Sequence, residues 1–434
     1  MDLLQLSILL LLLLFILLGT GLWIAMALAA VGWVGMAMVH PDPGPFLAGA
    51  MWESTGSWTL AALPMFVWMG EILFRTKLSE ELFNGLAPWV QRIPGRLLHV
   101  NIFACGIFGA VSGSSAATCA TIAKIALPEL RRRGYDENVA IGSLATSGTL
   151  GILIPPSIIM VVYAAAAEVS IIRVFIAGCI PGVIVMGLFS LYIAIWAMLN
   201  PRKQPPREPH TTLMQKLRQS AQLFPCGLLI ACTIGSMFSG WATATEAAAF
   251  GVGGSLILAG VTGSLSWKTF LDSLRGATRV SCMILFILAG AGFLTKAMAL
   301  TGIPAALAAG VAAMHLGPYG VIALLAVVYI GLGCALDGVS MIVLTTSIVI
   351  PMIQAAGFDL VWFGIFIVLL VEIAQITPPV GFNLFVMQTM TGREQTEVAR
   401  ASLPFFGMLV VTILLITMFP QTLVTGLGDW LLAR

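Results

Sequence analysis

Long apolar runs separated by short polar breaks dominate the chain. Because a membrane-spanning helix needs about 20 apolar residues, the block from Leu3 to Val39 is long enough for two short helices, with a break near Gly19-Thr20-Gly21. The same criterion predicts further membrane helices at about 60–76, 138–165, 173–199, 222–240, 243–263, 281–300, 360–388 and 402–424. Two more apolar stretches, 97–127 and 320–350, are interrupted by small and polar residues.

The chain contains an internal repeat. A polar, proline-rich segment at 200–210, which predicts an extended loop, lies near the middle of the chain, and many transporters consist of two related halves. A single offset of 223 residues pairs six positions, four of them prolines: Pro128 with Pro351, Gly134 with Gly357, Asp136 with Asp359, Pro155 and Pro156 with Pro378 and Pro379, and Pro181 with Pro404.

The distribution of basic residues indicates that the two halves are inverted in the membrane. Arg131-Arg132-Arg133 precedes Gly134, whereas Gln354-Ala355-Ala356 occupies the matching positions. After the proline pairs the bias is reversed, since Arg393 and Arg400 follow the second pair and no basic residue stands at 164–172. Basic loops lie preferentially in the cytoplasm. We therefore predict that Arg131–Arg133, 200–210 and 390–400 are cytoplasmic and that 354–359 is external.

This topology makes the two interrupted stretches re-entrant hairpins. The segment 97–127 is flanked on both sides by arginines predicted to be cytoplasmic, so it must enter the membrane and return, and 320–350 should do the same from outside. Backbone that is not helical is tolerated at membrane depth only where protein or water surrounds it. The predicted tips are Ser112-Gly113-Ser114-Ser115 and the stretch 331–338.

Composition narrows the class of protein. Only 21 basic and 19 acidic residues occur in 434, or 9% against roughly 25% in soluble chains, while 59% of residues are hydrophobic and the mean hydropathy is +1.01. These values exclude a soluble enzyme, a disordered chain and a nucleic-acid binder. The 45 glycines, 22 prolines and long apolar runs favour helices over a β-barrel. The predicted fold is an all-α polytopic membrane protein built from inverted repeats.

Two predicted membrane helices are broken by Pro-Pro at repeat-equivalent positions, within 148–157 and 376–381. Two consecutive prolines remove two backbone donors and free carbonyl groups in the preceding turn. A kinked helix satisfied by its neighbours is one interpretation. The recurrence favours another, because paired discontinuous helices mark ion and substrate sites near the membrane midplane.

Isolated polar side chains in the apolar segments are further candidates. The Ser112–Ser115 tip offers hydroxyl groups and a close backbone approach, although serine is also a packing residue between membrane helices. Asp337 and Glu372 are acids within apolar segments, which makes each a functional or a structural group. Lys296 either pairs with an anionic substrate or extends to the membrane surface. No nucleotide-binding P-loop is present, so uphill transport would require an ion gradient or an energised partner.

The motifs together resemble those of the large membrane subunit of tripartite ATP-independent periplasmic (TRAP) transporters, over nearly the whole chain. The residues that carry the resemblance are Ser112-Gly113-Ser114-Ser115, Arg133-Gly134-Tyr135-Asp136, Gly151-Ile152-Leu153-Ile154-Pro155-Pro156-Ser157, Phe175-Ile176-Ala177-Gly178, Pro181-Gly182, Ala242-Thr243-Ala244-Thr245-Glu246 and Thr377-Pro378-Pro379-Val380-Gly381.

The resemblance implies an elevator-type secondary transporter of the ion-transporter superfamily in the bacterial inner membrane. It implies sodium-coupled uptake of an organic acid, usually a carboxylate, with a periplasmic substrate-binding protein and a separate small four-helix membrane subunit as partners. We expect that subunit to be a separate chain, because this sequence begins at the first helix of the large-subunit domain. The substrate is left open among dicarboxylates, sialic acid, 2-oxo acids, sugar acids and amino-acid-like compounds.

The resemblance also suggests site residues. Its first sodium site consists of Ser112, Gly113, Ser114 and Ser115 with carbonyls at Gly148 and Gly151. Its second sodium site consists of Asp337, Gly338, Thr377, Pro378 and Gly381, although the second tip matches the family pattern only loosely. The substrate carboxylate is assigned to Ser115, Ser157 and Lys296. Lys124 stands where the resemblance implies a small residue.

We predict five segments of the chain: N-terminal scaffold helices at 1–56, a first repeat at 57–200, a cytoplasmic loop and amphipathic linker at 201–221, connecting scaffold helices at 222–280, and a second repeat at 281–434. An alternative function is that of a self-sufficient sodium–carboxylate symporter of the same superfamily. A membrane-embedded enzyme and a passive channel are weaker alternatives, the enzyme because no serine has a plausible neighbouring base.

Overall fold

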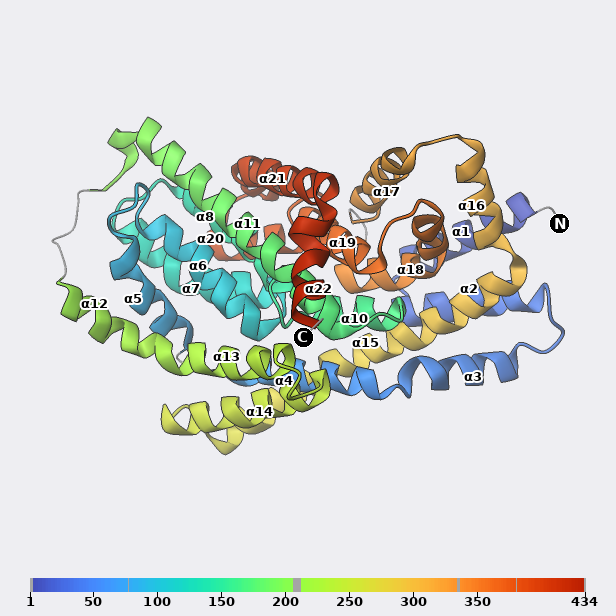
Figure 1. Cartoon of the computed structure of the whole chain (residues 1–434), viewed down its shortest axis with the longest axis horizontal. Helices are drawn as coiled ribbons and strands as arrows, with labels where there is room; N and C mark the ends of the chain where they lie inside the picture. The colour runs from blue at the N-terminus through green and yellow to red at the C-terminus, as the bar shows by residue number, and fades with distance from the viewer. Residues whose placement is uncertain (1–2, 77, 206–211, 334–335, 380, 433–434) are drawn as a thin grey trace.

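A computed structural model of the chain describes residues 3–76, 78–205, 212–333, 336–379 and 381–432. Every regular element in this part of the chain is helical (Figure 1). The first half contains α1 (Leu3–Gly19), α2 (Ile24–Ala37), α3 (Gly44–Thr55), α4 (Ala62–Phe74), α5 (Leu78–Val90), α6 (Leu97–Ser112), α7 (Ser115–Arg132), α8 (Glu137–Ser147), α9 (Leu150–Leu153), α10 (Ile158–Ala166) and α11 (Ile171–Leu199). The second half contains α12 (Leu213–Ser220), α13 (Phe224–Phe238), α14 (Ala244–Val261), α15 (Trp267–Thr301), α16 (Ile303–Ala313), α17 (Pro318–Gly333), α18 (Gly338–Ala355), α19 (Leu360–Gln375), α20 (Phe382–Thr391), α21 (Gln395–Met418), a π-helical turn (Gln421–Thr425) and α22 (Gly426–Leu432).

The predicted membrane helices are present, with shifted ends. The break between α1 and α2 falls at the predicted glycines, and α15 begins at Trp267, well before the predicted start at 281. By length and composition, α11, α14, α15 and α21 are each able to cross a membrane, and the total rises to as many as eight if sharply bent helix pairs count as single spans. Hydropathy did not predict α3, α5 or α16, because a short helix, or one with acids such as Glu80 and Glu81, has no long apolar run.

One layer of the molecule is organised around the long helix α15. Helices α2, α3 and α4 pack along it, α14 packs on α4, and α13 packs on α14, so that these six helices form the lower layer in Figure 1. Glycines allow the close approach. A Cβ atom added to Gly290 of α15 would lie 2.3 Å from the carbonyl oxygen of Ala25, so the backbones of α15 and α2 are nearly in contact.

The other layer contains two copies of one helical arrangement. The bounds of α7, Ser115 and Arg132, shifted by 223 residues give Gly338 and Ala355, which are the bounds of α18. A hairpin (α6–α7, then α17–α18), a broken helix (α8–α10, then α19–α20) and a long helix (α11, then α21) follow in the same order in both halves. The order of the helices thus agrees with the repeat predicted from sequence.

The two copies pack on each other reciprocally. Helix α7 contacts α20 and its equivalent α18 contacts α10, while α8 contacts α21 and its equivalent α19 contacts α11. Exchanged contacts of this kind are those of two units related by a two-fold rotation. The arrangement supports a two-fold repeat, while its inversion in the membrane stays a prediction.

The close approach of α15 to α2 makes Gly290 sensitive to a single methyl group. We expect Gly290→Ala to destabilise the protein by about 1–3 kcal/mol, since the new methyl group meets backbone that must move. Gly253→Ala is the matched control, because that glycine is exposed on α14 with no atom within 4 Å of the new Cβ. Thermal unfolding in detergent measures the difference, and equal melting temperatures for the two variants would contradict the prediction.

Candidate functional site

The first hairpin turns at Gly113 and Ser114, as predicted. Gly113 ends α6 in the left-handed region (φ 61°), which favours glycine. Ser114 begins α7 as its N-cap, and its hydroxyl accepts from the Ala117 amide at 3.5 Å. Inside the turn the hydroxyl groups of Ser112 and Thr118 are 2.6 Å apart. Polar groups of the tip are thus satisfied within the hairpin.

This tip lies directly against the first broken helix. A Cβ atom added to Gly151 would be 2.9 Å from the carbonyl oxygen of Ser114 and 2.7 Å from the Thr118 hydroxyl. Gly148, one turn earlier, faces Cys119 of α7 in the same way, because its Cβ would lie 2.5 Å from that side chain. The structure therefore brings Ser114, Gly148 and Gly151 of the predicted first set together, with Ser112 in the same tip.

Pro155 and Pro156 end α9, and Ser157 repairs the break. The Ser157 hydroxyl donates to the Ile152 carbonyl at 2.6 Å and accepts from the Met160 amide at 3.4 Å, so it satisfies the last turn before the prolines and begins α10. Ser157 is buried, and so is Ser115 at the start of α7. Their predicted contact with the substrate carboxylate stays a prediction, and the Ser157 hydroxyl already has a backbone partner on either side.

The second tip has a carboxylate where the first has a hydroxyl. Asp337, equivalent to Ser114, is the N-cap of α18 and accepts from the amides of Val339 at 3.1 Å and Ser340 at 3.3 Å, as well as from the Ser340 hydroxyl. A Cβ added to Gly338 would lie 2.5 Å from Val371 of α19. The second hairpin therefore contacts its broken helix before the break, in the body of α19.

The other predicted members of the second set lie in the turn after α19. The Thr377 hydroxyl donates to the Ile373 carbonyl at 2.7 Å, and the Gly381 amide donates to the Thr377 carbonyl at 3.1 Å across Pro378 and Pro379. Gln395 Nε2 satisfies the Pro379 carbonyl at 2.7 Å. Asp337 and Gly338 are thus held against α19, whereas Thr377, Pro378 and Gly381 are held by the turn that follows it.

Lys296 belongs to the layer around α15. Its ammonium pairs with the carboxylate of Glu53 on α3, 2.5 Å away, and its side chain is 43% exposed. The predicted substrate contact of Lys296 stays a prediction, and the partner that the structure gives is an acid of α3. Lys124 is exposed, so it lies outside the packed face of α7.

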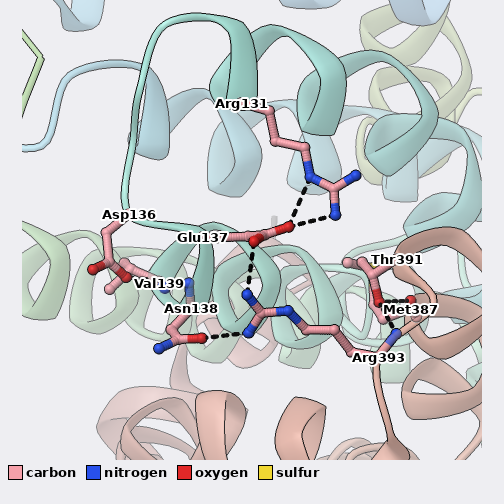
Figure 2. A network of polar contacts seen from close by, with 8 residues as sticks. All are labelled: Arg131, Asp136, Glu137, Asn138, Val139, Met387, Thr391 and Arg393. Atoms are coloured by element: carbon pink, nitrogen blue, oxygen red, sulfur yellow. Dashed lines mark hydrogen bonds and ion pairs between the residues drawn. The ribbon is translucent and has the colours of Figure 1, made fainter.

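A polar network that the sequence did not reveal joins the two repeats (Figure 2). Arg393, in the loop between α20 and α21, donates to Glu137 at 2.7 Å and to the Asn138 side chain at 2.7 Å, and Arg131 also donates to Glu137 at 2.7 Å. The sequence predicts that Arg131 and Arg393 are both cytoplasmic and assigns them no contact with each other's repeat. Their shared contact with Glu137 agrees with the prediction that both arginines lie on the same side of the membrane. Asn383 of α20 adds a second link through its bond to the Ala145 carbonyl, 2.9 Å away.

Paired helical hairpins, each beside a Pro-Pro-broken helix in an all-helical apolar chain, define a membrane transport permease. The family described as "Tripartite ATP-independent periplasmic transporter, DctM component" matches residues 9–422, and the chain belongs to this family of large bacterial inner-membrane permeases. The resemblance inferred from the sequence motifs is thereby confirmed.

Relatives and solved structures agree with this assignment. The chain is 33% identical to the C4-dicarboxylate TRAP transporter large permease protein DctM of Pseudomonas aeruginosa, over 91% of this chain and 92% of that protein. It is 32% identical to the ectoine/5-hydroxyectoine TRAP transporter large permease protein UehC of Ruegeria pomeroyi, over 84% of each. The YdaH transporter of Alcanivorax borkumensis shares the fold, with a TM-score of 0.63 at 12% identity over 93% of this chain and 98% of that one. The relatives are permeases, which supports a transport role and not an enzymatic one.

The contact between the first tip and its broken helix predicts that Gly151 tolerates no side chain. Because a methyl group there meets the Ser114 carbonyl and the Thr118 hydroxyl, we expect Gly151→Ala to separate α7 from α9, to cost about 1–3 kcal/mol of stability and to impair transport. Gly187→Ala in α11 is the matched control, since its new Cβ has no atom within 4 Å. Uptake in cells, normalised to the amount of membrane protein, tests this prediction. Native uptake by the Gly151 variant would refute it.

Proposed function

We propose that this chain is the large transmembrane subunit of a sodium-coupled, binding-protein-dependent secondary transporter that imports an organic acid by an elevator mechanism. The observation that carries the proposal is the contact of the first hairpin tip with the broken helix, where the Ser114 carbonyl and the Thr118 hydroxyl face Gly151. Such a junction of a hairpin with an unwound helix is where secondary transporters bind their coupling ions.

The chemistry of the first tip suits sodium. Ser112, Ser114 and Thr118 offer hydroxyl and carbonyl oxygens, and hard cations prefer oxygen ligands. Sodium would be co-transported cargo, and its inward gradient would supply the free energy of uptake. Asp337, on the equivalent tip, offers a full negative charge and suits a second ion. The Pro156 carbonyl is a further oxygen group beside the first tip, 3.3 Å from a Cβ added to Gly113.

The two-layer arrangement supports an elevator movement. Reciprocal packing of α7 on α20 and of α18 on α10 joins both hairpins and both broken helices into one body. The layer around α15 is joined by its own close contacts, such as Gly290 against Ala25. We propose that the first body carries substrate and ions and slides against the second.

The relatives suggest the substrate class and the partners. Their names specify a C4-dicarboxylate and ectoine, both small organic acids, so we propose a small carboxylate-bearing substrate here. The TRAP family further suggests a periplasmic binding protein that delivers the substrate and a small four-helix membrane subunit. In the lipid-embedded complex we place that subunit against the layer around α15, which would then be the fixed body.

Reconstitution of the chain with its small subunit tests the coupling. We expect uptake to require both an inward sodium gradient and a liganded binding protein. Full activity in sodium-free buffer would contradict sodium coupling, and uptake without the binding protein would favour a self-sufficient sodium–carboxylate symporter. Screening the binding protein for thermal stabilisation by a panel of carboxylates would identify the substrate.

Asp337→Asn tests the second ion site in the same assay. Asparagine is an N-cap as good as aspartate, so we expect the variant to fold and insert normally. Loss of the charge should raise the half-saturating sodium concentration about tenfold, equivalent to about 1.4 kcal/mol. Asp272→Asn, at an exposed ion pair with Arg275 on α15, is the control. An unchanged sodium titration would make Asp337 a helix cap without a role in transport.

A further inference from the structure

Glu372 is a buried acid that neither hairpin tip uses. It lies in α19, its side chain is 0% exposed, and neither carboxyl oxygen makes a hydrogen bond within the described residues. Its neighbours along the helix, Leu369, Val371 and Ile373, are fully buried and apolar. An isolated carboxylate in such surroundings is very costly, and an ionisable residue inside the membrane is a functional group by default.

One polar group beside Glu372 is Thr149, in the other repeat. Thr149 precedes α9, which packs on α19, and its hydroxyl lies beside the Glu372 carboxyl. The hydroxyl hydrogen is already used, because Thr149 donates to the Thr146 carbonyl at 2.7 Å. A threonine hydroxyl has one hydrogen to donate, so Thr149 presents only lone pairs to Glu372. The geometry there is that of two facing acceptors.

Gln375 adds another acceptor. It lies three residues after Glu372, on the same face of α19, and its Oε1 atom is buried without a hydrogen-bond partner among the described residues. The two carboxyl oxygens of Glu372 and Gln375 Oε1 are therefore buried acceptors without a donor among the described residues, and Thr149 presents a further acceptor to Glu372. These acceptors stand where the two repeats meet, since Thr149 and Glu372 are themselves equivalent at the offset of 223 residues.

Charged and titratable side chains on the helices around α19 are engaged elsewhere. Tyr163 of α10 donates to the Leu360 carbonyl, Tyr329 of α17 bonds to Thr345, and Asp337 caps α18. The described residues include no ion pair for Glu372. The remaining charged groups on these helices stand toward their ends: Arg173 on α11, Asp359 before α19, and Glu397 and Arg400 on α21. Among the described residues, no cationic side chain supplies the counter-charge for Glu372.

We propose that Glu372, Gln375 and Thr149 form a buried binding site for a monovalent cation, sodium, between the two repeats. One monovalent ion neutralises one carboxylate, whereas a divalent ion would leave a buried positive charge. Oxygen atoms alone suit a hard cation. The site is distinct from the hairpin tips, because Thr149 and Gly151 stand two positions apart, about 200° around a helix, so that Thr149 faces α19 while Gly151 faces α7.

The site deepens the proposed sodium coupling, on which it rests. A cation between Thr149 and Glu372 would join the first broken helix to the second, and this link would be present only with the ion. Gly148 and Gly151, which contact the first hairpin, flank Thr149. Occupation of this site would therefore fix the segment against which the first tip closes.

Glu372→Gln tests the site, because glutamine keeps the shape and removes the charge. In the reconstituted complex with choline as the balancing cation, we expect the half-saturating sodium concentration to rise at least about tenfold and the sodium dependence to become less steep. Sodium-induced stabilisation of the purified complex against heat should fall in parallel. Glu397→Gln, an exposed acid at the start of α21, is the control and should titrate like the native protein.

A second pair of variants keeps the test decisive if Glu372→Gln does not fold. Thr149→Val keeps the shape and removes the oxygen, whereas Thr149→Ser keeps the oxygen. We expect the valine variant to lose sodium affinity and the serine variant to keep it. Equal sodium titrations of these two variants, or a native titration in Glu372→Gln, would overturn the site while sodium coupling of the native protein still stands.

Two further measurements distinguish a failure of sodium coupling, and a bound proton, from a sodium ion bound at Glu372. If the native complex shows no sodium dependence at all, the proposed function fails and this site fails with it. If infrared spectra at saturating sodium show a protonated carboxyl band that Glu372→Gln removes, the occupant is a proton, and the sodium site is overturned. Loss of sodium affinity in Glu372→Gln with no such band supports the proposal.

Discussion

Satisfaction of backbone polar groups away from water is the constraint on which the structure depends. A continuous membrane helix meets it internally, but a Pro-Pro break or a hairpin tip does not. In this chain each interruption is repaired by a particular side chain. Ser157 donates a hydrogen bond to the Ile152 carbonyl, Gln395 donates one to the Pro379 carbonyl, and Ser114 caps α7. In the described residues, a side chain thus satisfies the non-helical backbone at each of these three places, and two of them, at Ser114 and Pro379, belong to the candidate ion sites.

Close packing follows from the same constraint. Because the hairpins and breaks must be enclosed by protein, helices approach one another until backbone meets backbone, as Gly151 does with Ser114 and Gly290 with Ala25. Such contacts leave no room for a methyl group. Close backbone contacts of this kind therefore occur within each of the two layers.

The sequence predicted the features that depend on local chemistry. The Gly113 turn, both Pro-Pro breaks and the 223-residue repeat were visible, because glycine, proline and apolar length act over short distances. Contacts between residues far apart in the chain could not be predicted from the sequence: Lys296 pairs with Glu53 across 243 positions, and Arg393 donates to Glu137 across 256. Amphipathic helices such as α5 lack the apolar length on which the prediction relied. The repeat offset alone would have paired Glu372 with Thr149, but only the fold places them side by side.

The reciprocal packing of the repeats has a consequence for biosynthesis. Helix α7 packs on α20, and α8 packs on α21, so the first hairpin and the first broken helix gain part of their packing only from the last quarter of the chain. Membrane proteins insert from the N-terminus as they are synthesised. The first half therefore enters the bilayer before the faces of α7 and α8 that pack on α20 and α21 are covered.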